Sequence, residues 1–267
     1  MNYLDKIVAR KREVVAELKK KQPLALLERQ LDDAPQTLPF ALGIRERNGI
    51  IAEFKRQSPS KGLIHQGAIS PKDVAPLYEQ AGVSAISCLT DIDFFGGAIA
   101  DLREAVASVK IPILRKDFII DEYQIVEARV NGASAILLIA AILSRDEVKR
   151  FARLAQELGM EVLLELHNED ETDYVAEGVT VAGINNRDLR TFEVDLERSI
   201  RVSHLLPKEM PRISESGIRS IDDMIHLRSE GFDGFLIGET FMKCENPGEM
   251  CIDFCNKYSL AWKNAAK

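Results

Sequence analysis

The chain has 267 residues, of which 46% are hydrophobic and 29% are charged, and its formal net charge is −7. This is an ordinary globular composition, and the acidic balance argues against a general nucleic-acid surface. No run of about 18 uncharged apolar residues occurs, so we expect no membrane span.

The N-terminal segment predicts two helices ahead of the first strand. Apolar residues recur at approximately helical spacing over residues 4–18, which is typical of an amphipathic helix. A short helix is expected over residues 24–30, with Pro23 at its start, and a loop over residues 32–39. The segment lacks the apolar centre of a signal peptide and the acid-poor character of a transit peptide, so a cytoplasmic location is expected.

Beyond this segment, strand-like and helical stretches alternate. Eight strands are predicted, near residues 50–54, 84–89, 111–115, 133–139, 161–166, 180–184, 211–215 and 233–238. The helices between them are expected over residues 72–80, 99–108, 122–131, 145–158, 169–177, 196–205 and 221–230. Such alternation favours parallel βαβ units, and eight of them close most naturally into a (β/α)8 barrel. A doubly wound open sheet is the alternative, although the glycine-rich fingerprint usual after its first strand is missing.

Polar residues end five of these apolar runs. Burying them costs free energy unless they are paired or used, and barrel active sites lie at the C-terminal ends of strands. We therefore expect one catalytic mouth, with structural salt bridges as the simpler alternative. The residues concerned are Glu53 and Lys55, Lys116, Glu165, Asn185 and Glu215.

Two glycine-containing elements follow the seventh and eighth strands. Residues 214–218 include Ser216 and Gly217, and residues 237–242 include Gly238 and Glu239. Backbone amides at this position make the usual phosphate site of a barrel, whereas the alternative is a pair of plain turns. The Glu239 carboxylate would repel phosphate, so its side chain is expected to point to solvent.

Two loops are further candidates for substrate contact. Residues 58–62, with Ser58 and Ser60, form a polar loop that could close as a lid or could be merely solvated. Phe94 and Phe95 stand beside Gly96 and suggest a wall for a flat apolar group, although core packing is an alternative. The four histidines have no ligand spacing, so we expect no metal, and no nucleotide-cofactor motif is visible.

Several motifs resemble the indole-3-glycerol phosphate synthase family of tryptophan biosynthesis. They cover nearly the whole chain and occur in the family's order, at residues 4–12, 51–62, 89–97, 114–118, 164–167, 183–189 and 214–218. The resemblance implies a single (β/α)8 domain over residues 1–267, whose helical extension, residues 1–45, covers the active-site face. It also implies a carboxy-lyase without cofactor or metal. Such an enzyme converts anionic 1-(2-carboxyphenylamino)-1-deoxyribulose 5-phosphate into indole-3-glycerol phosphate, CO2 and water.

The same resemblance assigns expected roles. Lys116 is the general acid toward the ketone oxygen, Lys55 pairs with the substrate carboxylate, and Glu53 orients both lysines. Glu165 is the general base of the dehydration. Asn185 and Glu215 are expected to contact the substrate amine and hydroxyls, and Arg187 to support its own loop. The expected substrate contacts also include Ser58, Ser60, Phe94 and Ser216. The phosphate is expected to be bound by Gly217, Gly238 and Glu239. These transfers need lysine pKa values lowered toward neutral, as crowding of two ammonium groups would produce.

Two other functions stay open at this point. A Schiff-base aldolase on a phosphate-binding barrel would use Lys55 or Lys116 as nucleophile. An inactive barrel could serve as a binding module, although the intact charged residues argue against it. The resemblance further implies transient contact with other tryptophan-pathway enzymes and gives no reason to expect nucleic-acid or membrane partners.

Overall fold

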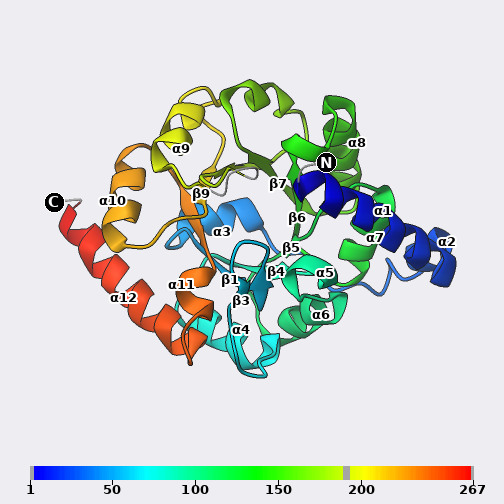
Figure 1. The fold of residues 1–267 in the computed structure, drawn as a ribbon, viewed down its shortest axis with the longest axis horizontal. Helices are drawn as coiled ribbons and strands as arrows, with labels where there is room; N and C mark the ends of the chain where they lie inside the picture. The colour runs from blue at the N-terminus through cyan, green and yellow to red at the C-terminus, as the bar shows by residue number, and fades with distance from the viewer. Residues whose placement is uncertain (1–2, 189–192, 266–267) are drawn as a thin grey trace.

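A computed structural model describes residues 3–188 and 193–265. Eight parallel strands close into a barrel in the order β1-β4-β5-β6-β7-β8-β9-β10, with β10 pairing back to β1. Figure 1 looks along this barrel, with the strands inside and the helices around them. The predicted (β/α)8 fold is thereby confirmed. The strands are β1 (Ile50–Phe54), β4 (Ala85–Leu89), β5 (Ile113–Lys116), β6 (Ala135–Ile139), β7 (Glu161–Leu166), β8 (Val181–Asn185), β9 (Arg212–Glu215) and β10 (Gly234–Ile237).

The outer helices begin where the sequence provides caps. Ser70, Ser144 and Ser220 each form a capping box, in which the serine and an acidic residue three positions later exchange side-chain and backbone hydrogen bonds. The helices are α4 (Pro71–Gln80), α6 (Ile99–Ser108), α7 (Glu122–Val130), α8 (Arg145–Glu157), α9 (Leu196–Ser203), α10 (Ile221–Ser229) and α12 (Pro247–Ala265). No described helix is long and apolar enough to cross a membrane.

One predicted helix differs from the structure. Residues 169–177 were expected to be α-helical, but only a 3₁₀ helix, η2 (Glu169–Tyr174), forms there. Its first turn carries three carboxylates, at Glu169, Asp170 and Glu171. Carboxylates in a first turn do not themselves oppose an α-helix, but η2 buries none of its residues, and a segment this short gains too little from packing to offset the cost of helix nucleation.

The N-terminal extension divides between the two ends of the barrel. It comprises α1 (Tyr3–Lys21), α2 (Leu24–Glu28) and α3 (Phe40–Glu46), the last of which the sequence did not predict. Phe40 and Ile44 of α3 are fully buried among the inward-facing residues of the strands. Glu161, at the start of β7, accepts hydrogen bonds from the backbone N–H of Phe40 and of Ala41, both at 2.8 Å.

These contacts place α3 at the N-terminal ends of the strands, where it closes the bottom of the barrel. In Figure 1 it is seen within the ring of strands. Of the extension expected over the active-site face, α3 lies at the far end of the barrel, whereas Tyr3, Leu4 and Ile7 of α1 line the cavity at the opposite end.

The α3 plug generates the first prediction. Phe40→Ala should lower the free energy of unfolding by about 3–5 kcal/mol, because it removes a large side chain from a site that cannot collapse. Urea unfolding followed by circular dichroism measures this change. Leu42→Ala, on the same helix but 50% exposed, is the matched control and should change it by about 0.5 kcal/mol or less. Equal losses in the two variants would contradict the plug.

Candidate active site

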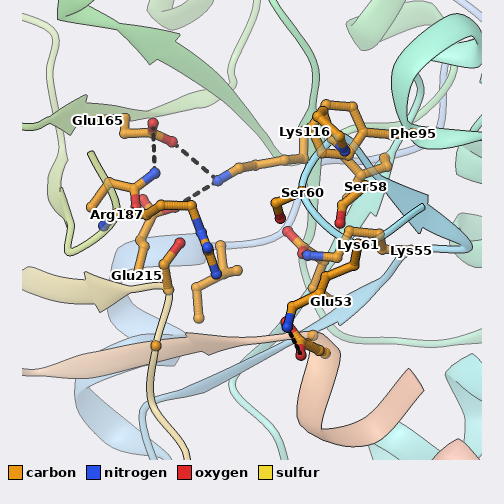
Figure 2. A pocket seen from close by; sticks show the side chains of 18 of the residues that line it. Glu53, Lys55, Ser58, Ser60, Lys61, Phe95, Lys116, Glu165, Arg187 and Glu215 are labelled. Atoms are coloured by element: carbon orange, nitrogen blue, oxygen red, sulfur yellow. Dashed lines mark hydrogen bonds and ion pairs between the residues drawn. The ribbon is translucent and has the colours of Figure 1, made fainter. Parts of the chain in front are cut away.

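A cavity of about 580 Å³ opens at the C-terminal ends of the strands. The polar residues predicted from the strand ends all line it, and the structure thus brings together Glu53, Lys55, Lys116, Glu165, Asn185 and Glu215. The three glutamates are at most 3% exposed. Figure 2 shows their side chains converging from several strands. Charge buried at this depth must be paired, and the pairs define the site.

Lys116 is the centre of one group. Its Nζ lies 2.5 Å from Glu215 Oε2 and 3.2 Å from Glu165 Oε2, and Asn185 Nδ2 donates to Glu165 Oε1 at 3.0 Å. Strand register explains the arrangement, because it sets Asn185 directly beside Glu215 on the neighbouring strand. A lysine reaching across the barrel mouth therefore meets two carboxylates from other strands.

Gly183 makes room for this group. It pairs with Glu165 in the β7–β8 register, and a Cβ on it would lie 2.2 Å from Glu215 Oε1. A glycine inside a strand commonly marks such a close approach. The sequence contained this signal, a glycine within an otherwise apolar run, but its meaning required knowledge of the neighbouring strands.

The lysine pKa expected from the sequence is wrong for Lys116. Burial alone would lower its pKa, but the charges of Glu215 and Glu165 outweigh burial and raise it. Burial would likewise raise the pKa of Glu165, yet Lys116, His167 and Asn185 lower it below its usual range. For Glu215, burial prevails over Lys116 and the pKa is raised. Two carboxylates with pKa values pushed in opposite directions are typical of an acid–base site.

Glu53 and Lys55 form a separate pair. Lys55 Nζ lies 2.6 Å from Glu53 Oε1, and Ser87 Oγ donates to Glu53 Oε2 at 3.3 Å. In Figure 2 this pair lies apart from Lys116, which points toward Glu165 and Glu215. Among the described residues, Lys55 is thus the only ion-pair partner of Glu53, and the two ammonium groups lie in two distinct clusters instead of being crowded together.

The loop after β1 and the aromatic wall complete the rim. Ser58 and Ser60 line the cavity from a small hairpin, β2 (Gln57–Ser58) and β3 (Gly62–Leu63). Phe95 lines the cavity, whereas Phe94 is not among its lining residues. Both lie on the short helix α5 (Ile92–Phe95), where successive side chains point about 100° apart. The Phe94 ring packs edge-on against Tyr3 of α1, with the centroids 6.0 Å apart.

The two glycine elements lie on the cavity wall as predicted. Ser216 and Gly217 have φ values of 67° and 74°, and a Cβ on Gly217 would lie 2.1 Å from Val194 Cγ1. Gly238 precedes α11 (Glu239–Met242), and a Cβ there would lie 2.7 Å from Glu53 Oε1. Both glycines are thus required by close approach. The Glu239 side chain is 44% exposed and lies 3.8 Å from Lys61, so it does point outward.

Several further residues that line the cavity were not predicted from the sequence. Arg219 and Lys243 add positive charge near the two glycine elements, and Tyr3, Leu4 and Ile7 of α1 contribute an apolar roof. Arg187 lines the cavity as expected, and its backbone N–H donates to Asn185 Oδ1 at 3.0 Å. Single basic residues in loops carry no pattern that would have distinguished them from a solvated surface.

α1 is held over the mouth by a buried lysine. Lys11 Nζ lies 2.6 Å from Asp91 Oδ2 and 2.7 Å from Asp117 Oδ1, and all three side chains are at most 6% exposed. Asp91 caps α5, which carries the aromatic wall, and Asp117 directly follows Lys116. One ammonium group therefore fixes α1, the wall and the end of β5 to each other.

His167 also lies in this region, although its sequence spacing suggested nothing. It is 5% exposed, and its Nε2 is 3.2 Å from Glu165 Oε1. Within the described residues no group of three or more histidine, cysteine or acidic side chains is arranged to hold a metal ion.

Comparisons with known proteins agree on one family. The family model for indole-3-glycerol phosphate synthase matches residues 4–252. An indole-3-glycerol phosphate synthase from Bacteroides thetaiotaomicron is 46% identical over 254 residues, covering 95% of this chain and 97% of that protein. One from Desulfotalea psychrophila is 44% identical over 256 residues, covering 94% and 98%.

Solved structures of lower identity share the fold alone. One, described as native KDPGal, has a TM-score of 0.56 at 15% identity and covers 81% of this chain and 95% of its own. A thiamine phosphate pyrophosphorylase from Pyrococcus furiosus has a TM-score of 0.56 at 13% identity and covers 79% and 95%.

The Lys11 contacts generate the second prediction. Lys11→Met should cost about 3–5 kcal/mol of stability at pH 7, because it removes the buried ammonium group between Asp91 and Asp117 and leaves Asp117 with Arg115 alone. Lys19→Met is the matched control, since Lys19 pairs with Asp121 from the same helix with both side chains at least 32% exposed. It should cost about 0–1 kcal/mol in the same urea titration.

The pH dependence adds a second measurement. Burial would raise the pKa of Asp117, but Lys11 and Arg115 lower it to about 2. The stability from ionised Asp117 is thus fully present above its unfolded pKa of about 4 and is lost as pH falls through about 2. Lys11→Met should flatten this acid-range loss, and an unchanged slope would contradict the pairing.

Proposed function

The chain belongs to the indole-3-glycerol phosphate synthase family, and we propose that its polar barrel mouth performs the ring closure of that family. The reaction is a decarboxylating ring closure followed by dehydration, within tryptophan biosynthesis. It acts on a phosphorylated small molecule. The observation that carries the residue assignment is Lys116 held between Glu165 and Glu215 at the cavity wall.

Lys116 is the proposed general acid toward the ketone oxygen. Its ammonium group is fully charged at neutral pH because two carboxylates hold it, so a proton is present for donation. A bound substrate that engages Glu215 through its hydroxyls would weaken one of these contacts. The Lys116 pKa would then fall toward a value suited to acid catalysis.

Glu165 and Asn185 form the proposed base and its orienting partner. The Asn185 amide fixes Glu165 Oε1, which leaves Oε2 shared with Lys116. As Lys116 gives up its proton, Glu165 loses its strongest positive neighbour and becomes a better base. The two roles are thus coupled in time, the acid step preparing the base step.

Lys55 is the proposed partner of the substrate carboxylate, with Glu53 as its orienting group. The Lys55 side chain is 17% exposed and reaches the cavity, whereas Glu53 is 4% exposed beneath it. Ser58, Ser60 and Phe95 would surround the aromatic ring, and Arg187 would hold the loop after β8. The α1 roof would exclude water from this end of the site.

The proposed phosphate subsite is formed by Gly217, Gly238 and the Glu239 amide, with Ser216 beside them. The two elements follow β9 and β10, where barrels usually bind phosphate. Arg219 and Lys243 line the same part of the cavity and would add long-range attraction for a dianion.

A Schiff-base mechanism is disfavoured by the same geometry. Imine formation requires a neutral amine, and Lys116 lies within 3.2 Å of two carboxylates that stabilise its ammonium form. Lys55 is likewise paired at 2.6 Å.

A cytoplasmic location is also proposed. All four cysteines are free, and no disulfide joins Cys251 and Cys255, whose sulfur atoms lie 3.9 Å apart. Free thiols at this distance are typical of a reducing compartment. Transient contact with other enzymes of the pathway stays a prediction.

The third prediction concerns Lys116. Lys116→Met should lower kcat for 1-(2-carboxyphenylamino)-1-deoxyribulose 5-phosphate by on the order of 10²–10⁴, with a smaller change in KM. Product indole fluorescence measures the rate. Lys110→Met, at an exposed position just before β5, is the control and should be near wild type. Near-normal turnover by Lys116→Met would refute the assignment, as would borohydride labelling of Lys116 in the presence of substrate.

The fourth prediction concerns the phosphate subsite. Gly217→Ala should raise KM by on the order of tenfold, about 1.4 kcal/mol, because the new methyl group would displace the loop from Val194. Gly82→Ala shares the positive φ, 76° against 74°, but has open space at its Cβ. The Gly82→Ala variant therefore shows the effect of backbone strain alone. Steady-state kinetics on both variants should separate this strain from the displacement of the loop at Gly217. Equal KM values would argue against this loop as the phosphate site.

A further inference from the structure

His167 is a buried titratable group for which the proposed roles leave no task. Its side chain is 6% exposed, with Nε2 3.2 Å from Glu165 Oε1 and Nδ1 3.7 Å from Glu171 Oε2. Neither ring nitrogen has a hydrogen bond of good geometry among the described residues. The ring is therefore close to two carboxylates without being locked to either, one on each of its nitrogens.

The second carboxylate connects this ring to the surface. Glu171 lies on η2, and the backbone N–H of His167 donates to its Oε2 at 2.5 Å. The Glu171 side chain is 13% exposed, and its neighbours Glu169 and Asp170 are exposed. A continuous row of proton-binding groups thus runs from Glu165, through His167, to Glu171 at the edge of solvent.

The chemistry of ring closure requires a proton from solvent. The ketone oxygen of the substrate leaves as water, so it must take up two protons. The methylene carbon beside the amine releases one proton as the indole double bond forms. The substrate carboxylate is ionised at neutral pH and departs as CO2, so it supplies none. Each turnover therefore consumes one proton that must enter the site from outside.

The open side of the cavity is a poor entrance for that proton. During the reaction it holds the substrate, beneath the α1 roof of Tyr3, Leu4 and Ile7 and beside the loop with Ser58 and Ser60. The imidazole instead reaches Glu165 from the connection between β7 and η2, and neither His167 nor a residue of η2 lines the cavity.

We propose that Glu171 and His167 form a proton relay that returns one proton per turnover to Glu165 and Lys116. The proposal rests on the acid and base roles given above to these two residues. Charged His167 carries a proton on each ring nitrogen and releases the one on Nε2 to Glu165, which leaves the neutral ring with its remaining proton on Nδ1. A half-turn of the ring, which no hydrogen bond to a described residue holds in place, then presents the bare nitrogen to Glu171 and takes up the next proton there. Glu165 then passes a proton to Lys116 across their 3.2 Å contact, restoring the ammonium group. No bond other than those to protons forms or breaks.

The surroundings favour a ring that stays charged between transfers. Burial would lower its pKa, but contact with Glu165 and Glu171 raises the pKa of His167 to about 9. Of the charged groups on the helices packed against η2, Arg145 of α8 pairs with Asp173, and on α9 Arg201 pairs with Glu169 while Arg198 lies 3.9 Å from Asp188. Lys116 faces the ring only across Glu165.

The test compares His167→Gln, Glu171→Gln and the matched control Glu169→Gln. Glutamine preserves the polarity and approximate size of the replaced side chain but does not titrate. Glu169 is a matched control because it occupies an exposed position on η2, the element that carries Glu171. In His167→Gln, steady-state kcat should fall about ten- to a hundredfold with KM little changed. The first turnover, measured with enzyme in excess, should stay near wild type because the resident protons suffice for it. Glu171→Gln should show the same pattern, and Glu169→Gln should match wild type.

Two readouts separate proton supply from a merely structural role. Raising the imidazole buffer concentration at constant pH and ionic strength should restore kcat of His167→Gln and leave wild type unchanged. The wild-type kcat should also decline above pH 9 as the ring loses its charge, and this decline should be missing in the variant. Wild-type kcat in His167→Gln overturns the relay, as does an equal loss in first and later turnovers that buffer does not restore. If His167→Gln does not fold, Glu171→Gln decides by the same criteria.

The outcome also distinguishes the relay from the function on which it rests. If wild-type protein forms no indole product, the proposed function fails. If wild-type protein forms product and both relay variants behave as wild type, the function stands and the relay alone is refuted.

Discussion

The ammonium group of Lys116, buried between Glu165 and Glu215, is the interaction on which the site depends. Moving three carboxylates and two ammonium groups from water to the barrel mouth costs several kcal/mol for each ion unless each finds a partner at close range. Glu53, Glu165 and Glu215 give three negative charges against two from Lys55 and Lys116. Charged His167 adds a third positive charge at the edge of this cluster, between Glu165 and Glu171.

Burial of apolar side chains elsewhere in the fold offsets the free-energy cost of burying these charged groups. Inward-facing strand residues pack with Phe40 and Ile44 below the charges, so α3 completes a core that the barrel alone would leave open. Backbone pairing between strands then sets which side chains meet, as the β8–β9 register does for Asn185 and Glu215. At the other end, Lys11 joins α1 to Asp91 and Asp117. The mouth is thus held rigid from below by packing and from above by a buried ion pair, as electrostatic preorganisation requires.

The sequence predicted the eight strands and the charged ends because both are local patterns. An apolar run needs no partner to be recognised, and Glu165 or Glu215 is conspicuous at its end. The misses depended on contacts between distant segments. No element was predicted for residues 40–46, where α3 forms, because its apolar residues matter only against the barrel floor. Phe94 and Phe95 could not be told apart without the orientation of α5. The Lys116 pKa was expected to fall because two lysines were placed together, whereas strand geometry gave each its own carboxylate.

That separation of Lys55 from Lys116 bears on how one oxygen receives two protons. The ketone oxygen is protonated first as the ring closes and again as it leaves, and between these events the substrate loses CO2 and changes shape. A single donor would have to recover its proton within that interval. Two clusters on different strands allow different donors to face the oxygen at each stage, each with its own carboxylate to stabilise the charged form. The Glu53–Lys55 pair, to which Ser87 donates a hydrogen bond, is a second charged group on the cavity, separate from Lys116. The division of charge into two clusters, which the strand ends alone did not reveal, therefore suits a reaction with two acid steps.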